Sequence, residues 1–247
     1  MTLHTRDQLL IGFALTGVVA LAWAYLYAVS LDMDLGGMAS MHAWTLLDVA
    51  LMFVMWAVMM VGMMVPSAVR AVLIYDGIAR RADAQGTPVA AASWFVAGYV
   101  LVWTLFSIVA AALQWALVEC GLLSQMAVSV SPVFGAGLLI AAGVYQLTSW
   151  KDRCLKHCQS PAMYLAQRFK PGVANAVGLG IGHGAYCLGC CWLLMGLLFF
   201  GGVMNLVWIA AVAAFILLEK MLPATLRLAR VTGVIMIVSG TLYLGIF

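Results

Sequence analysis

Charged side chains are scarce in this 247-residue sequence, in which Asp, Glu, Lys and Arg together make up 9%, against about 25% in an average soluble domain. Hydrophobic residues make up 66%. A soluble fold of this length exposes much of its area to water and could not hide so many apolar side chains. The scarcity of charge therefore excludes an ordinary soluble protein, and we expect an all-α, polytopic transmembrane helical bundle.

Two motifs that would point to particular activities are also absent. The sequence has no nucleotide-binding loop, so any transport would be passive, coupled to an ion, or driven by a partner chain. It has no c-type haem attachment motif, although His42, His157 and His183 leave non-covalent haem ligation open.

Seven runs approach or exceed the roughly 20 apolar residues with which a helix crosses a bilayer. They are Leu9–Ser30, Trp44–Pro66, Pro88–Val118, Pro132–Trp150, Val173–Phe200, Met204–Leu218 and Val231–Phe247. The last two are the shortest, and the count falls to six if they do not both cross. The core of the first run is too long for a signal peptide, so we expect a retained anchor. We predict a single transmembrane domain over 1–247.

Lys and Arg are absent from every second connecting segment. The segments 31–43, 119–131 and 201–203 have none, and all 12 basic residues lie on the other side of the seven-span arrangement. Because Lys and Arg mark cytoplasmic loops, this separation predicts a cytoplasmic N-terminus in a bacterial inner membrane. The net charge of +3 is then explained by the basic residues of the cytoplasmic loops. It gives no reason to expect that the protein binds nucleic acid. The cytoplasmic connectors 67–87 and 151–170 are predicted to contain short amphipathic helices.

Three cysteines gather within five residues of the fifth run. His183, Cys187, Cys191 and Met195 are spaced by four, so they share one face of a helix, and Cys190 lies beside that face. Thiolates and thioethers suit Cu(I), with Zn(II) as the second choice. A free Cys is otherwise a small buried hydrophobe, but this grouping favours an intramembrane metal site.

A second group of ligand types lies in the connector 151–170. Cys154, His157 and Cys158 fall within about one helical turn. This spacing is less specific than a zinc knuckle, and it favours a cytoplasmic relay or delivery site. Thiolates must be deprotonated to bind a metal, so both groups should bind in a pH-dependent way.

Methionine is abundant, with 16 residues, and four recur at helical spacing in the second run: Met52, Met55, Met59 and Met63. Such a stripe either forms a soft-metal route or fills a helix core. Ionisable residues near a span are functional candidates, but Glu219 and Lys220 could equally sit at the membrane interface, with Lys220 snorkelling. The accessory metal candidates are Met195, Met59, Met63, Met38, Met41, His42 and Glu219.

Several ordered blocks between about 60 and 225 carry a family resemblance. They include Cys-Leu-x-His-Cys at 154–158, Cys-x-Gly-Cys-Cys-Trp at 187–192, and Glu219-Lys220 ahead of Pro223. The set resembles a bacterial family of uncharacterised, predicted metal-binding integral membrane proteins. The resemblance implies a multi-span metal-binding protein and gives no substrate.

The leading hypothesis is a membrane protein that binds copper(I) for transfer or transport across the inner membrane. Its expected partners are the lipid bilayer, the metal ion, and a metallochaperone or partner membrane subunit. A thiol–disulfide or quinone-linked redox enzyme is the alternative, since Cys187 and Cys190 have Cys-x-x-Cys spacing. The reducing side expected for Cys154 and Cys158 argues against it. A non-catalytic subunit of a larger complex is a third possibility. Enzymatic activity is not favoured, and no catalytic residue is assigned.

Overall fold

The computed structural model describes residues 3–34, 46–87, 89–124, 128–222 and 228–246. Over these ranges the regular structure is helical, apart from one isolated bridge between Leu123 and Ser129. The predicted all-α fold is confirmed. The helices are α1 (Leu3–Asp34), α2 (Leu46–Asp83), α3 (Ala92–Glu119), α4 (Pro132–Gln146), α5 (Ser149–Gln159), α6 (Pro161–Arg168), α7 (Val173–Gly196), α8 (Leu198–Gly201), α9 (Leu206–Met221) and α10 (Leu228–Ile246).

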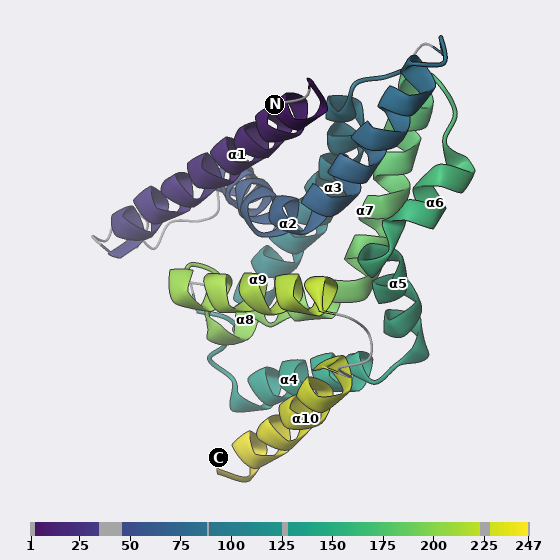
Figure 1. Cartoon of the computed structure of the whole chain (residues 1–247). Coiled ribbons are helices and arrows are strands. Elements are labelled where there is room, and N and C mark those ends of the chain that lie inside the picture. Colours follow the sequence, from purple (N-terminus) through teal and green to yellow (C-terminus); the bar gives the residue numbers. More distant parts are fainter. Residues whose placement is uncertain (1–2, 35–45, 88, 125–127, 223–227, 247) are drawn as a thin grey trace.

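The helices pack in pairs that divide the molecule into two ends and a middle (Figure 1). At one end α1 and α3 each pack against α2, and α3 runs along α7. At the other end α4 lies beside α10, near the C-terminus. The middle is crossed by α9, and α5 packs against α7. α5 therefore links the α4–α10 pair to the α3–α7 pair.

α2 continues through Pro66, the residue at which the sequence predicts the end of a span. Proline has no N–H, so the carbonyl of Gly62, four residues earlier, lacks its usual partner within the helix. The indole Nε1 of Trp23 on α1 donates to this carbonyl at 3.3 Å. Residues 67–83 of the predicted connector are thus helical, but they form the last part of a 38-residue helix.

The connector predicted over 151–170 forms two short helices, α5 and α6. α5 begins after Thr148, whose hydroxyl oxygen accepts a hydrogen bond from the Lys151 N–H at 3.3 Å. This is the usual role of Thr at a helix N-terminus. The axes of α4 and α5 differ by 68°, and Pro161 begins α6. The bend turns α5 away from α4 and onto α7.

Glycines let α3 and α7 approach closely. A Cβ atom at Gly180 would overlap the carbonyl oxygen of Phe95, and one at Gly98 would overlap that of Val177. Small residues at such contacts are typical of helix pairs in membranes. The close packing of α3 on α7 brings Tyr99 against the cysteine-bearing face of α7.

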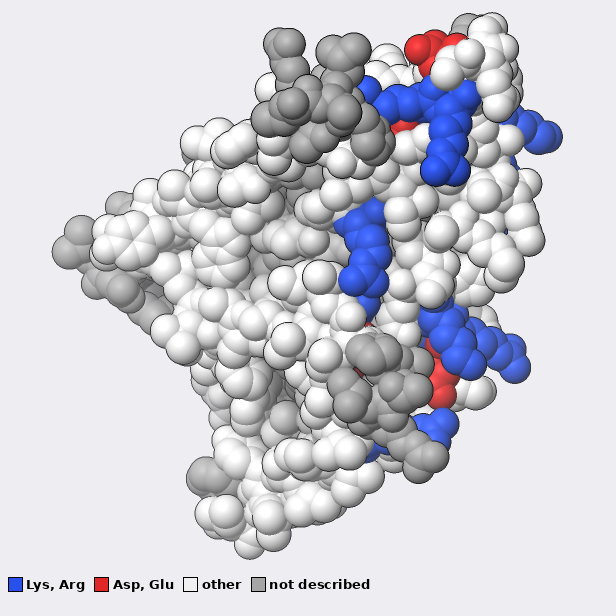
Figure 2. Space-filling model, viewed as in Figure 1, with Lys and Arg blue, Asp and Glu red and all other residues white. Residues whose placement is uncertain are grey.

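Five helical segments of the described chain are long and apolar enough to cross a membrane: α1, α2, α3, α7 with α8, and α10. The bent pair of α4 and α5 brings the number to six if the pair crosses as one span. α9, expected as the sixth of seven spans, has 16 residues. Many large apolar side chains are exposed. In Figure 2 the Lys and Arg side chains gather along one side of the molecule, and the opposite side in this view is uncharged.

Candidate metal centre

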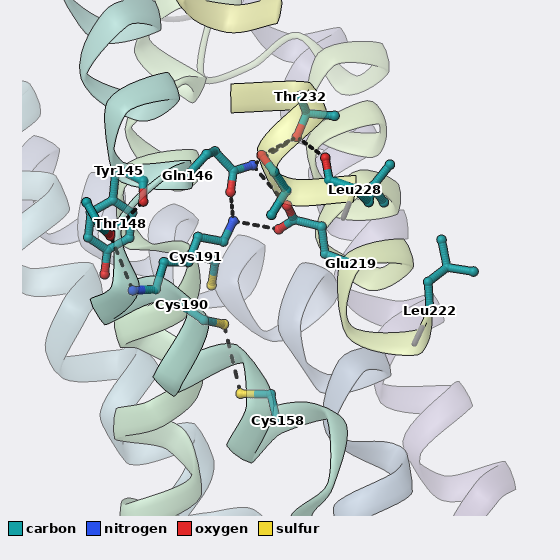
Figure 3. A network of polar contacts seen from close by, with 12 residues as sticks. Tyr145, Gln146, Thr148, Cys158, Cys190, Cys191, Glu219, Leu222, Leu228 and Thr232 are labelled. Carbon is teal, nitrogen blue, oxygen red and sulfur yellow. Dashed lines mark hydrogen bonds and ion pairs between the residues drawn. The ribbon is translucent and has the colours of Figure 1, made fainter. Parts of the chain in front are cut away.

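Two cysteines from different helices meet in the interior of the protein. Cys158 near the end of α5 and Cys190 on α7 are both buried, and their sulfur atoms are 3.9 Å apart (Figure 3). The sequence assigns them to separate sites, one at the cytoplasmic rim and one within the membrane. The bend between α4 and α5 brings the two groups together, so that they form one thiol cluster.

The face of α5 that carries Cys158 also carries Cys154, one turn earlier. Cys154 lies against Gly189, where a Cβ atom would come within 2.9 Å of its sulfur. The hydroxyl of Tyr145 on α4 donates to the Gly189 carbonyl. A small residue at this position therefore lets α5 lie close enough to α7 for the cysteines to meet.

Cys187, one turn before Cys191 on α7, is the most heavily contacted of the thiols. The Nζ of Lys220 on α9 donates to its sulfur at 2.9 Å, and the hydroxyl of Tyr99 lies 3.0 Å from that sulfur. The thiols of Cys190 and Cys191 each donate to the Cys187 carbonyl at 3.0 Å. The cluster thus combines four buried thiols with one buried ammonium group.

Lys220 reaches this cluster from the last turn of α9. It is 4% exposed, so it does not lie at an interface with its amine in water. Its Nζ also donates to the hydroxyl of Ser67 on α2 at 3.0 Å. The hydroxyl of Tyr99 in turn donates to the Met64 carbonyl at 3.0 Å. These bonds tie α2, α3, α7 and α9 together around Cys187.

A second buried polar network lies next to the cluster (Figure 3). The Nζ of Lys151 is 2.7 Å from a carboxylate oxygen of Glu219, and it also donates to the side-chain carbonyl of Gln146. The Gln146 amide donates to the other Glu219 oxygen at 2.9 Å and to the hydroxyl of Thr232 at 3.4 Å. Glu219, an accessory metal candidate in the sequence, is therefore engaged by a lysine and an amide.

The two histidines among the predicted ligands occupy other surroundings. His183 is buried on α7, with its ring centroid 5.8 Å from that of Tyr99 and 6.0 Å from that of Phe95. The His157 ring stacks on Tyr186 with a centroid distance of 4.1 Å, and its Nδ1 is 2.9 Å from the Arg153 carbonyl. Both rings are held by aromatic packing, and no hydrogen bond joins either of them to a thiol among the described residues.

The predicted methionine candidates divide into two sets. Met59, Met63 and Met195 are buried in the hydrophobic cluster that also contains Cys158, Cys187, Cys190 and Cys191. Their packing in this core agrees with the interpretation that these methionine side chains fill the interior between helices. It also places them in the same hydrophobic cluster as the four buried cysteines. Met38, Met41 and His42 lie outside the described residues.

Within the described ranges, no three His, Cys, Asp or Glu side chains are arranged to hold a metal ion. The arrangement that is present is the facing pair of Cys158 and Cys190, with Cys187 in the adjoining turn. Soft thiols of this kind suit Cu(I). Sequence reasoning left the role of Lys220 open and missed Tyr99, because neither carries a motif that signals contact with a distant cysteine.

The chain also matches a known family. No curated protein and no solved structure shows a match. The sequence profile of the PpoB2 family, described as a copper chaperone, matches residues 53–243. This range contains all the buried cysteines and the two buried lysines. Because the match spans most of its length, the chain belongs to the PpoB2 copper chaperone family.

Proposed function

We propose that this protein spans the bacterial inner membrane and carries Cu(I) as cargo for transfer across or along it. In this proposal Cys158 and Cys190 bind the ion, and Cys187 is the donor available to complete or exchange the coordination. The copper-related role follows from the family. The membrane location, the ligand set and the transfer step are what we propose.

The observation that carries the proposal is the 3.9 Å separation of the Cys158 and Cys190 sulfur atoms. At a metal–thiolate bond length of about 2.3 Å, as in zinc sites, one ion bound to both sulfurs would subtend an angle of about 116°. This value lies between tetrahedral and trigonal geometry. A soft ion can therefore bridge the two helices with little movement of either sulfur, and Cu(I) is the ion that thiolates favour.

Burial of the thiols supports the choice of a transient cargo site. Cys158 is 8% exposed and Cys190 is 1% exposed, so a bound ion would be shielded from water and from other thiols. α5 has 11 residues and is bounded by the bend at Leu147–Thr148 and by the break at Ser160. A short helix that supplies one ligand can open the site without unfolding α7.

The membrane part of the proposal rests on apolar surface and charge distribution. The candidate spans expose many large apolar side chains, which lipid would cover. Basic residues lie at the end of α2, along α5 and α6, and at the end of α9. Under the positive-inside rule these ends are cytoplasmic, which agrees with a cytoplasmic N-terminus and a single transmembrane domain over 1–247, with 67–87 and 151–170 on the cytoplasmic side.

A redox enzyme is the second candidate, because the same sulfur pair favours it. Oxidation of Cys158 and Cys190 to a disulfide would form one S–S bond and release two protons and two electrons. The electrons would need an acceptor such as a membrane quinone. This function predicts quinone-dependent loss of free thiols, whereas the copper function predicts metal binding by the reduced protein.

The test is metal loading of the purified, reduced protein in detergent under anaerobic conditions. Wild type should retain Cu(I) against a competing chelator, and the Cys158→Ser and Cys190→Ser variants should lose it. Cys120→Ser is the matched control, because Cys120 is exposed and follows directly after α3, outside the thiol cluster. Equal copper content in wild type and the Cys158→Ser/Cys190→Ser double variant would contradict the proposal.

A further inference from the structure

We infer that Cys154 is the entry ligand of the thiol cluster, which takes Cu(I) from a water-soluble thiol donor and passes it to Cys158 and Cys190. This inference rests on the proposed function and adds a residue that the proposed ligand set does not contain. It follows from the different exposure of two cysteines on the same face of α5, and from the contact of one of them with α7.

Cys154 differs in exposure from the other cysteines of α5 and α7. It is half-buried, whereas Cys158, Cys187, Cys190 and Cys191 are buried. A donor that carries Cu(I) on its own thiols therefore has no direct access to the pair of Cys158 and Cys190 in this conformation. An ion destined for that pair needs a first protein ligand that the donor can reach, and the Cys154 sulfur meets this need.

The turns of α5 place Cys154 between an exposed and a buried position. Residues four apart on a helix differ by about 40° around the axis and by about 6 Å along it, so Cys154 lies midway between Trp150 and Cys158. Trp150 is 67% exposed and Cys158 is 8% exposed. Two turns of α5 thus lead from the protein surface through Cys154 to the buried site.

The Cys154 sulfur also lies against α7, beside the second ligand. A Cβ atom at Gly189 would come within 2.9 Å of this sulfur, and Gly189 directly precedes Cys190. Because Gly189 has no side chain, the sulfur rests on the α7 backbone one residue from Cys190. An ion on Cys154 would therefore lie next to both helices that supply the buried ligands.

The exposed surface beside Cys154 is basic. Arg153 and Lys156 are both exposed on α5, while Asp152 is paired with Arg230 at 3.5 Å. Basic side chains gather in Figure 2 on the side where α5 lies in Figure 1. Cu(I) bound by two thiolates is an anion, and a surface of opposite charge raises the rate at which such a complex is met. The donor class is therefore an anionic Cu(I) complex of a water-soluble thiol.

The transfer consists of three ligand exchanges, and copper remains Cu(I) throughout. Each exchange breaks one Cu–S bond, forms another, and moves one proton from the incoming thiol to the departing sulfur. Cys154 first replaces one donor thiol, and Cys190 then replaces the second. Cys158 finally replaces Cys154, which regains its proton. Cys154 therefore changes how fast the ion enters and leaves, and it adds nothing to the final affinity.

The experiment measures rates and equilibrium separately. The reduced protein in detergent is mixed anaerobically with Cu(I)–glutathione to follow loading, and copper is removed again by excess glutathione. In Cys154→Ser both rate constants should fall by about tenfold or more, which corresponds to about 1.4 kcal/mol of barrier. The Cu(I) affinity from chelator competition should keep its wild-type value, because a step on the path alters both rates by the same factor. Cys120→Ser, at an exposed cysteine, should match wild type in all three quantities.

A second pair of variants separates metal ligation from side-chain shape. Cys154→Met keeps a soft donor sulfur, and Cys154→Leu has a side chain of similar volume without one. The Met variant should load copper faster than the Leu variant, whereas a merely structural role predicts equal rates. This comparison also covers the case in which Cys154→Ser does not fold, and equal loading rates of the Met and Leu variants would overturn the inference.

The outcomes distinguish this inference from the proposed function. If wild type takes up no Cu(I), the proposed function fails and the entry role fails with it. If wild type takes up Cu(I) and Cys154→Ser loads at the same rate, the function stands and the entry role is overturned. A loss of affinity in Cys154→Ser with an unchanged loading rate would also overturn it, because Cys154 would then be a ligand of the stored ion.

Discussion

Lys151 on α5 and Glu219 on α9 form a buried ion pair, with 2.7 Å between the Nζ and the carboxylate oxygen. The side chain of Lys151 is fully buried and that of Glu219 is 3% exposed. Lys151 is on the helix that carries Cys158, and Glu219 precedes Lys220. The pair therefore fixes α5 to the helix end that reaches the thiol cluster.

Removing one member of this pair should destabilise the protein strongly. Lys151→Met leaves the Glu219 carboxylate buried and unpaired, and breaking a buried pair in this way costs about 3–5 kcal/mol. The measurement is the midpoint of unfolding in detergent. Lys156→Met is the matched control, because Lys156 lies on the exposed side of the same helix and its loss should change stability by less than about 0.5 kcal/mol.

A double variant checks the electrostatic reason for this loss. Adding Glu219→Gln to Lys151→Met removes the unpaired charge, so part of the lost stability should return. If the double variant is as unstable as the sum of the two single variants, the pair does not act through charge.

Bound copper should protect the thiols that bind it. Alkylation of Cys158 and Cys190 by a small maleimide, followed by mass spectrometry, should be about tenfold slower or more after Cu(I) loading, the factor that about 1.4 kcal/mol of protection gives. Cys120 is exposed and should react at the same rate with and without copper. Equal protection of Cys120 would indicate that copper makes the whole protein less accessible to the reagent, and that Cys158 and Cys190 are not protected as ligands.

His183 should be dispensable for copper retention. It packs between Phe95 and Tyr99, so His183→Phe preserves the aromatic packing and removes the ring nitrogens. We expect the Cu(I) affinity to change by less than about tenfold, or about 1.4 kcal/mol. A loss as large as that of Cys190→Ser would restore His183 to the ligand set that its sequence spacing predicts.

The close approach of α3 to α7 should be sensitive to a single methyl group. Gly180→Ala would place a Cβ atom on the Phe95 carbonyl oxygen, and overpacking of this kind costs about 1–3 kcal/mol. Gly178→Ala is the control on the same helix, because nothing lies within 4 Å of a Cβ atom there. That variant should be neutral or slightly stabilised, since Ala favours helix more than Gly does. Equal destabilisation of both variants would show that the close contact with the Phe95 carbonyl is not the cause of the loss.

Sequence reasoning was sufficient for the features that depend on local composition. The all-α class follows from long apolar runs, and the grouping of Cys187, Cys190 and Cys191 on one helix follows from their spacing. The continuity of α2 through Pro66 did not follow. It depends on an indole donor from Trp23, 39 residues away, and no local pattern reports such a partner.

The candidate site shows the same division between local and distant information. Sequence spacing predicts the face of α5 that carries Cys158 and the face of α7 that carries Cys190. It does not predict that these two faces are in contact, because that contact depends on the bend between α4 and α5. From the sequence alone, Glu219 and Lys220 could equally be functional residues or residues at the membrane interface. In the structure the two side chains point to different partners, Cys187 and Lys151, because adjacent residues on a helix diverge by about 100°.

The meeting of Cys158 and Cys190 has a consequence for the chain as a whole. The two residues are 32 positions apart, so an ion held by both would close a ring through the end of α5, all of α6 and most of α7. Closing a loop of this size restricts the unfolded chain by roughly 3–4 kcal/mol if the metal acts as a disulfide does. The bound copper ion would then also stabilise the fold of its carrier. A partner that removes the ion would open the ring, so that copper release and loosening of the carrier would occur together.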